Sequence, residues 1–120
     1  MIVAVSAQGP TLDHPVDERF GRADHLLIVD SESLSFEAVD NSVNRDALEG
    51  AGLGAAEIVG RHGADAVITG HLGPKAFRAL IIADAPGYDG RGMTVREAVA
   101  ALEAGGLERL SEGEAHAGRQ

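Results

Sequence analysis

Short apolar runs and one alternating run predict most of the strands of a sheet. The continuous run at residues 2–5 is typical of a strand buried on both faces, and we place it at the centre. Residues 25–30 predict a second strand. Alternation over residues 34–38 predicts a half-buried third strand, antiparallel to the second. The run at residues 66–68 predicts another buried strand.

Residues 84–88 predict the fifth and weakest strand. Pro86 removes a backbone donor and Gly87 adds no side chain to pack, so both suit a strand at the edge of the sheet.

Two amphipathic helices are predicted between the later strands. One covers residues 51–62, has apolar residues on one face and ends at Gly63; the apolar face is formed by Leu53, Ala56 and Val59. The other begins at Pro74, which suits the first helical position. Its expected core residues are Phe77, Leu80 and Ile81. We expect a polar loop over residues 41–50, before the first of these helices.

The last helix has the clearest start signal. Thr94 can accept a hydrogen bond from the backbone of Glu97, whose side chain can return one, which predicts a capping box. Gly105 and Gly106 predict its end.

This order of elements predicts an α/β fold with a mixed five-stranded sheet flanked by helices, in the strand order 3-2-1-4-5. Residues 1–110 would form a single domain, and residues 111–120 a flexible C-terminal tail. In this topology the loops after the first, third, fourth and fifth strands emerge at one carboxyl edge, where open α/β sheets usually bind ligands.

The segment after the fourth strand is the strongest candidate for a binding loop. Gly70 and Gly73 allow the backbone to approach a ligand closely, and Lys75 adds a positive charge beside the helix N-terminus. Such a loop can hold an anion. A tight strand-to-helix connection with no ligand is the alternative.

The same edge gathers polar residues from the other loops. The binding residues that we expect there are Arg19, Gly21, Arg22, Asn41, Gly70, His71, Gly73, Lys75 and Arg91. Acidic residues share the region, so an alternative is that the charges pair with one another in solvent. His14 and His71 are the candidates for contact with a metal. No two histidines have the i, i+4 spacing of a zincin-type site.

Composition and charge exclude several classes of partner. The formal net charge is −9, from 19 acidic and 10 basic residues, and only 3% of residues are aromatic, which argues against nucleic-acid binding. There is no cysteine, and therefore no cysteine-ligated iron-sulfur cluster. No run has the length of a membrane span or the form of a signal peptide, so we expect a cytoplasmic protein without membrane contact.

Catalytic motifs are weak or missing. Residues 52–57 begin like a dinucleotide fingerprint, but Glu57 replaces the last glycine and no strand precedes them. There is no Walker A run, and no nucleophile elbow. The apolar central strand has no carboxylate to hold magnesium. These observations predict a protein that is not an enzyme.

Four stretches of the sequence carry a family resemblance over residues 1–110. They read MIVAVS at the start, DHPVDERFGRADHLLIVD from Asp13, ITGHLGPKAFRAL from Ile68 and GMTVREAVAALEAGGL from Gly92. With these motifs in this order, the chain resembles the dinitrogenase iron-molybdenum cofactor binding and biosynthesis family. The resemblance implies a ribonuclease-H-like (nitrogenase accessory factor-like) fold and a role in binding or carrying metal-sulfur clusters. It is greatest to the orange-protein branch, whose members hold a molybdenum-copper sulfide cluster without covalent attachment.

Two departures from the family pattern bear on the cluster. Arg19 stands where many members have His before the FGRA motif, and Leu72 occupies a loop position that can be Cys. A nitrogenase-type iron cluster is therefore disfavoured. An anionic molybdenum-copper sulfide cluster, which brings its own sulfur, needs only backbone N–H groups and cationic side chains.

The sequence thus predicts a non-enzymatic carrier of such a cluster. Two alternatives stay open: the edge could bind a phosphate-bearing molecule such as a nucleotide and serve regulation, or the fold could be an interaction module that docks to a P-loop ATPase partner.

Overall fold

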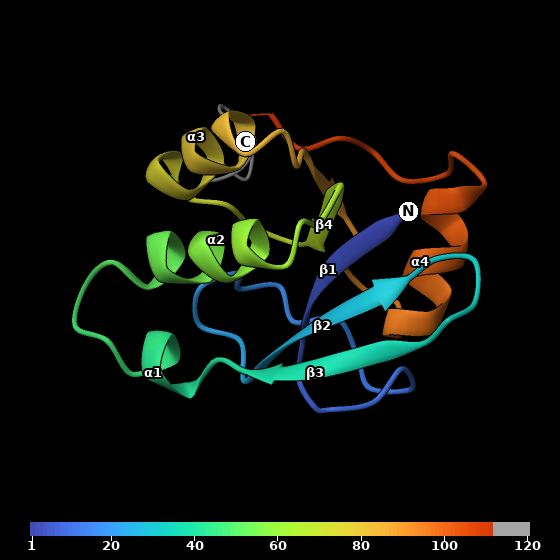
Figure 1. Cartoon of the computed structure of the whole chain (residues 1–120), viewed down its shortest axis with the longest axis horizontal. Helices are drawn as coiled ribbons and strands as arrows, with labels where there is room; N and C mark the ends of the chain where they lie inside the picture. Colours follow the sequence, from blue (N-terminus) through green and yellow to red (C-terminus); the bar gives the residue numbers. More distant parts are fainter. Residues whose placement is uncertain (112–120) are drawn as a thin grey trace.

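A computed structural model describes residues 1–111 (Figure 1). Apart from Ser111, the expected C-terminal tail lies outside the described residues. The described part contains a five-stranded sheet in the order β3-β2-β1-β4-β5, which confirms the predicted order. The strands are β1 (Ile2–Ala7), β2 (His25–Asp30), β3 (Phe36–Asp40), β4 (Ala66–Thr69) and β5 (Gly87–Asp89).

The strand directions also follow the prediction. β2 pairs antiparallel with both β1 and β3, and β4 pairs parallel with β1 and β5. The β2–β3 connection turns tightly because the Asp30 carboxylate accepts hydrogen bonds from the backbone N–H groups of Glu32 and Ser33. The carboxyl ends of β1, β3, β4 and β5 therefore meet at one edge of the sheet.

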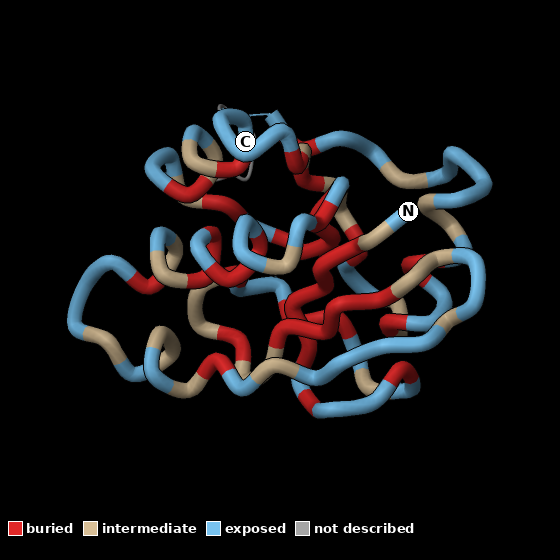
Figure 2. Tube along the Cα trace, viewed as in Figure 1, coloured by how far each residue is buried: buried red, intermediate tan, exposed pale blue. Residues whose placement is uncertain are grey.

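Helices cover both faces of the sheet. α2 (Ala51–Arg61) and α3 (Pro74–Ile82) lie on one face, and α4 (Val95–Glu103) lies on the other (Figure 1). Alternate residues of β1 divide between the two cores, since Ala4 packs with the α2 and α3 side and Val3 and Val5 with the α4 side. The buried centre of the sheet is visible in Figure 2. No helix within residues 1–111 is both long enough and apolar enough to cross a membrane.

β3 departs from the expected half-buried strand. It begins at Phe36, because Leu34 lies in the preceding turn with a φ of 64°. Four of its five residues are exposed, and Phe36 is 42% exposed. The physical reason is its position at the open edge of the sheet, where the helices do not cover it.

Two residues expected on buried helix faces lie at the surface. Ile81, which was expected in the core, is 45% exposed, so that assignment was wrong, and Leu53, which was expected on the apolar face of its helix, is 41% exposed. Ala55 and Ile58 fill the core on α2 in place of Leu53, which lies in the first turn of α2. The expected loop at 41–50 also contains a short helix, α1 (Ser42–Arg45), none of whose residues is buried.

The predicted start of the last helix and the predicted edge position of the fifth strand were correct. Thr94 Oγ1 accepts a hydrogen bond from Glu97 N at 3.1 Å, and the Glu97 carboxylate accepts one from Thr94 N at 3.0 Å, which confirms the capping box of α4. β5 lies at the edge of the sheet but covers only Gly87–Asp89, so Pro86 precedes it.

Candidate functional site

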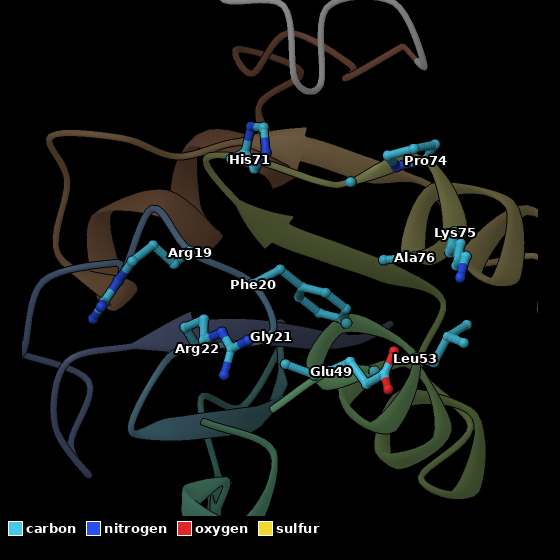
Figure 3. A pocket seen from close by; sticks show the side chains of 14 residues that line it. Arg19, Phe20, Gly21, Arg22, Glu49, Leu53, His71, Pro74, Lys75 and Ala76 are labelled. Carbon is cyan, nitrogen blue, oxygen red and sulfur yellow. The ribbon is translucent and has the colours of Figure 1, made fainter. Parts of the chain in front are cut away.

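A pocket of about 690 Å³ opens at the carboxyl edge of the sheet. Three segments line it: residues 19–22 after β1, residues 49–53 at the start of α2, and His71 with residues 73–76 at the start of α3. Figure 3 shows Phe20 between two rows of lining residues, with His71 and Pro74 on one side and Arg22 and Glu49 on the other. The volume lies within the usual range of small-molecule sites.

Two helix N-termini meet in this pocket, and neither is capped by a side chain from the part of the chain that the structure describes. Gly50 is the N-cap of α2 and Gly73 the N-cap of α3, and no side chain accepts a hydrogen bond from either first turn. The free N–H groups and the aligned peptide dipoles make both ends partially positive. Paired helix N-termini are therefore suited to an anion.

Close backbone contacts bring the three segments together. A Cβ atom at Gly21 would lie 2.6 Å from Ala51 C and from Gly52 N, so only glycine allows the β1 loop to touch the start of α2. A Cβ atom at Gly52 would lie 3.0 Å from Ala76 Cβ, at the contact between α2 and α3. The glycines thus determine how narrow the pocket is.

The basic residues around the pocket differ in how far their charge is neutralised. Arg19 forms a two-pronged ion pair with the buried Asp17 at 3.0 and 3.1 Å, and these hydrogen bonds raise the pKa of Arg19. Within residues 1–111, Arg22 donates only to carbonyl oxygens, those of Arg45 at 2.8 Å and Ala47 at 2.5 Å.

Lys75 has no hydrogen-bond or ion-pair partner within residues 1–111. Arg22 and Lys75 therefore supply uncompensated positive charge to the pocket. Glu49, also in the lining, opposes it.

Three of the expected binding residues lie outside the pocket lining. Asn41 is buried, and its side-chain amide donates to Gly21 O at 3.1 Å and to Ala23 O at 2.9 Å, so it holds the β1 loop in place. Gly70 is buried where the side chain of Arg91 crosses the backbone, and a Cβ atom at Gly70 would lie 2.6 Å from Arg91 Cγ. Asn41 and Gly70 therefore shape the loops around the pocket.

Arg91 lines a separate, smaller depression of about 260 Å³ and forms an ion pair with Asp89 at 2.8 Å. Partial burial raises the pKa of Asp89, but the hydrogen bonds from Arg91 lower it, and the net shift is downward. This pairing matches the alternative in which charges at the edge neutralise one another.

The two candidate metal contacts are separated. His71 is exposed at the pocket, and its ring has no hydrogen-bond partner in the described part of the chain. His14 lies outside the pocket lining, with its Nδ1 2.8 Å from Thr11 Oγ1. Residues 1–111 contain no cluster of three or more His, Asp or Glu side chains that could hold a metal ion. The donors at this site consequently suit an anion better than a bare cation.

Sequence reasoning missed the first turn of α2 and the neighbouring Phe20 and Glu49 as part of the site. Glycines at positions 50, 52 and 54 were the available signal, and residues 52–57 were considered only as a dinucleotide fingerprint. The helix predicted to begin at residue 51 follows the loop after the third strand, so its N-terminus had to lie at the carboxyl edge.

Comparisons with known proteins agree with this architecture. The apo form of the orange protein from Desulfovibrio gigas is 40% identical, with a TM-score of 0.87 and 92% of each chain covered. A NifB-like protein from Thermotoga is 35% identical, with a TM-score of 0.78 and coverage of 91% of this chain and 92% of that chain. A dinitrogenase-like protein from Methanocaldococcus jannaschii, 17% identical with a TM-score of 0.70, covers 92% of this chain and 95% of its own, and shares the fold.

Among curated proteins, none matches this chain. The family model for the dinitrogenase iron-molybdenum cofactor matches residues 1–105. The chain therefore belongs to the dinitrogenase iron-molybdenum cofactor family.

Proposed function

We propose that this protein binds and carries an anionic, molybdenum-containing sulfide cluster, with copper as its second metal, held without covalent attachment in the pocket between α2 and α3. The cluster is cargo, and the protein is a carrier, not an enzyme. The first-turn N–H groups of both helices donate to sulfide, Arg22 and Lys75 balance the charge, and His71 is placed to touch metal.

One observation carries this proposal: two uncapped helix N-termini and two uncompensated cations line the same pocket in a chain without cysteine. A cluster that needs thiolate ligands has none here, whereas an anion that brings its own sulfide requires only N–H donors and positive charge. Family membership and the likeness to the orange protein support the same class of cargo.

The test is reconstitution of the protein with tetrathiomolybdate and a copper salt, followed by desalting. We expect a visible charge-transfer band to stay with the protein, and metal analysis to find molybdenum and copper in a fixed ratio. The double variant R22A/K75A should retain little of the band. The matched double variant R61A/R96A, with two basic residues removed outside the pocket lining, should retain it. Loss of the band from the wild-type protein on desalting would contradict the proposal.

A phosphate-bearing small molecule is the second candidate, because the Glu49 carboxylate lies beside the same helix N-termini and could accept hydrogen bonds from ribose hydroxyls. If a nucleotide is the ligand, it should raise the melting temperature of the protein, and tetrathiomolybdate should displace the bound nucleotide. A screen in which nucleotides leave the melting temperature unchanged would eliminate this candidate. Docking to a P-loop ATPase partner stays a prediction.

A further inference from the structure

The segment at residues 42–50, which joins β3 to α2, has no buried side chain. Val43 is 85% exposed and Leu48 is 99% exposed, so apolar packing does not hold this segment against the body of the protein. Polar bonds must therefore fix its position.

Those polar bonds come from the end of β3, from the N-cap residue of α1 and from the loop before β2. Asp40 accepts from Ser42 N at 2.7 Å, Asn44 donates to Asn41 at 2.9 Å, and Arg45 pairs with Asp24 at 2.8 Å. Arg45 is held twice, by Asp24 at its guanidinium and by Arg22 at its carbonyl. Ala47, which is closer in sequence to the pocket-lining Glu49, is held by Arg22 alone among the side-chain bonds described.

Arg22 has donors left over for a second partner. Both hydrogen bonds to the segment come from Nη1, and the guanidinium also lines the pocket. A guanidinium has five N–H groups, so Nε and Nη2 keep three, in the planar fork that binds an anion through two parallel hydrogen bonds. An ammonium group has three N–H donors but no planar fork, so it cannot hold two carbonyls and also bind an anion through two parallel hydrogen bonds.

We propose that Arg22 is a positioning residue that couples occupancy of the pocket to the order of residues 45–50; the proposal rests on the proposed function of the pocket as an anion site. Nη1 holds the two carbonyls while the remaining N–H groups bind the anion. An anion that fixes the guanidinium thereby strengthens its hold on the segment. Linkage makes the effect reciprocal, so an ordered segment also tightens anion binding.

The consequence concerns the surface that the loaded protein presents. Leu48 and Val43 are exposed on this segment, and Leu48 directly precedes the pocket-lining Glu49. Their positions are better defined when the pocket is filled, and a protein that receives the cargo can thereby distinguish the loaded form from the empty form.

The experiment measures amide hydrogen exchange at Arg45, Asp46 and Ala47, whose N–H groups donate to the carbonyls of Asn41, Ser42 and Asn44, with and without tetrathiomolybdate. In the wild-type protein we expect a saturating concentration to slow exchange by at least about fivefold, the lower end of typical coupling factors. R22K should exchange faster than wild type without the anion. It should bind the anion more weakly and show no slowing at saturation. R61K, which changes an exposed arginine at the far end of α2, should behave as wild type.

The results distinguish the two proposals. Tetrathiomolybdate binding without slower exchange in the wild type, or equal slowing in R22K, would overturn the coupling and leave the anion site standing. No binding of tetrathiomolybdate by the wild type would overturn both.

Discussion

At the residue scale, the pocket depends on positions where a side chain is missing and on a few charges that lack a partner. Gly21 lets the β1 loop touch the backbone of α2, whereas a Cβ atom at Gly60, on the same helix, would meet no neighbouring atom within 4 Å. Lys75 and Glu49 bring opposite charges to one pocket. Substitutions at Gly21 and Gly60 should change stability in opposite directions, and substitutions at Lys75 and Glu49 should change anion affinity in opposite directions.

We expect Gly21→Ala to destabilise the protein by about 1–3 kcal/mol, because the new Cβ would overlap backbone atoms that cannot move aside cheaply. It should also weaken anion binding, since the start of α2 must shift. Gly60→Ala is the matched control and should stabilise by up to about 1 kcal/mol, because alanine is the better helix former and has space. Urea unfolding measures both changes. A Gly21→Ala variant as stable as the wild type would show that the contact is not tight.

Charge changes in the pocket should shift the affinity for tetrathiomolybdate in opposite directions. Lys75→Gln removes an uncompensated cation and should weaken binding roughly tenfold, the equivalent of about 1.4 kcal/mol. Glu49→Gln removes the opposing charge and should strengthen binding. Glu57→Gln, an exposed change on α2 outside the pocket lining, should leave the affinity unchanged. Spectroscopic titration at fixed ionic strength gives all three constants, and a stronger affinity in Lys75→Gln would refute the charge assignment.

At the element scale, the helices differ in how their N-termini are satisfied. α4 has a capping box, while the N-cap residues of α2 and α3 are the glycines Gly50 and Gly73. Gly73 has φ −68° and ψ 165°, almost the same backbone as Thr94 with φ −73° and ψ 164°. No atom lies within 4 Å of a Cβ at Gly73, so a capping side chain would fit there. Its absence leaves the first-turn N–H groups of α3 open to the pocket.

Gly73→Asp should therefore separate stability from binding. The carboxylate can cap α3 and should stabilise the protein by about 0.5 kcal/mol in the absence of ligand. The same group would occupy the donors and repel an anion, so tetrathiomolybdate binding should be lost. Thermal unfolding and the titration above measure the two effects, and undiminished binding would mean that the α3 amides do not contact the anion.

Thr94→Ala provides the control for capping. It removes the cap of α4, on the other face of the sheet, and should destabilise by about 1 kcal/mol. Anion affinity should not change, because Thr94 does not line the pocket.

At the scale of the whole molecule, a chain with a formal charge of −9 must attract an anion through local geometry. Several carboxylates are instead committed to turns and ion pairs. Hydrogen bonds from backbone N–H groups lower the pKa of Asp30 and Asp40, and those from Arg45 lower the pKa of Asp46. These groups help to set the pH range in which the fold is stable.

A carboxyl whose pKa is lowered by folding contributes stability that is fully present above its unfolded pKa, about 3.9 for Asp. That contribution is lost as the pH falls through the lower folded value. We therefore expect the melting temperature to fall steadily as the pH is lowered from about 5 to 3. Asp40→Asn should show a shallower fall, because one of the linked groups is gone. A melting temperature that rises over this interval would contradict the pKa directions.

The strands, helices and sheet order could largely be predicted, because hydrophobic period and capping signals are local. The clearest departures from these predictions concern burial, which depends on the elements that pack against a residue and not on the local sequence. The alternation at 34–38 correctly indicated a strand, but the pattern could not show that no helix would cover it. Leu53 and Ile81 were correctly placed in helices. Whether their side chains are buried, however, depends on how α2 and α3 pack against each other and against the sheet, which a local pattern does not show.

The sequence alone determined that any ligand at the carboxyl edge must be held without thiolates, and that glycines and basic residues would gather there. Six of the nine expected binding residues do line the pocket: Arg19, Gly21, Arg22, His71, Gly73 and Lys75. Only the tertiary structure decided which charges remain free, because Asp17 compensates Arg19 and Asp89 compensates Arg91 through contacts whose geometry depends on the fold. It also decided that a second helix N-terminus faces the first, since that depends on the close contact of Gly52 with Ala76, which are 24 residues apart along the chain.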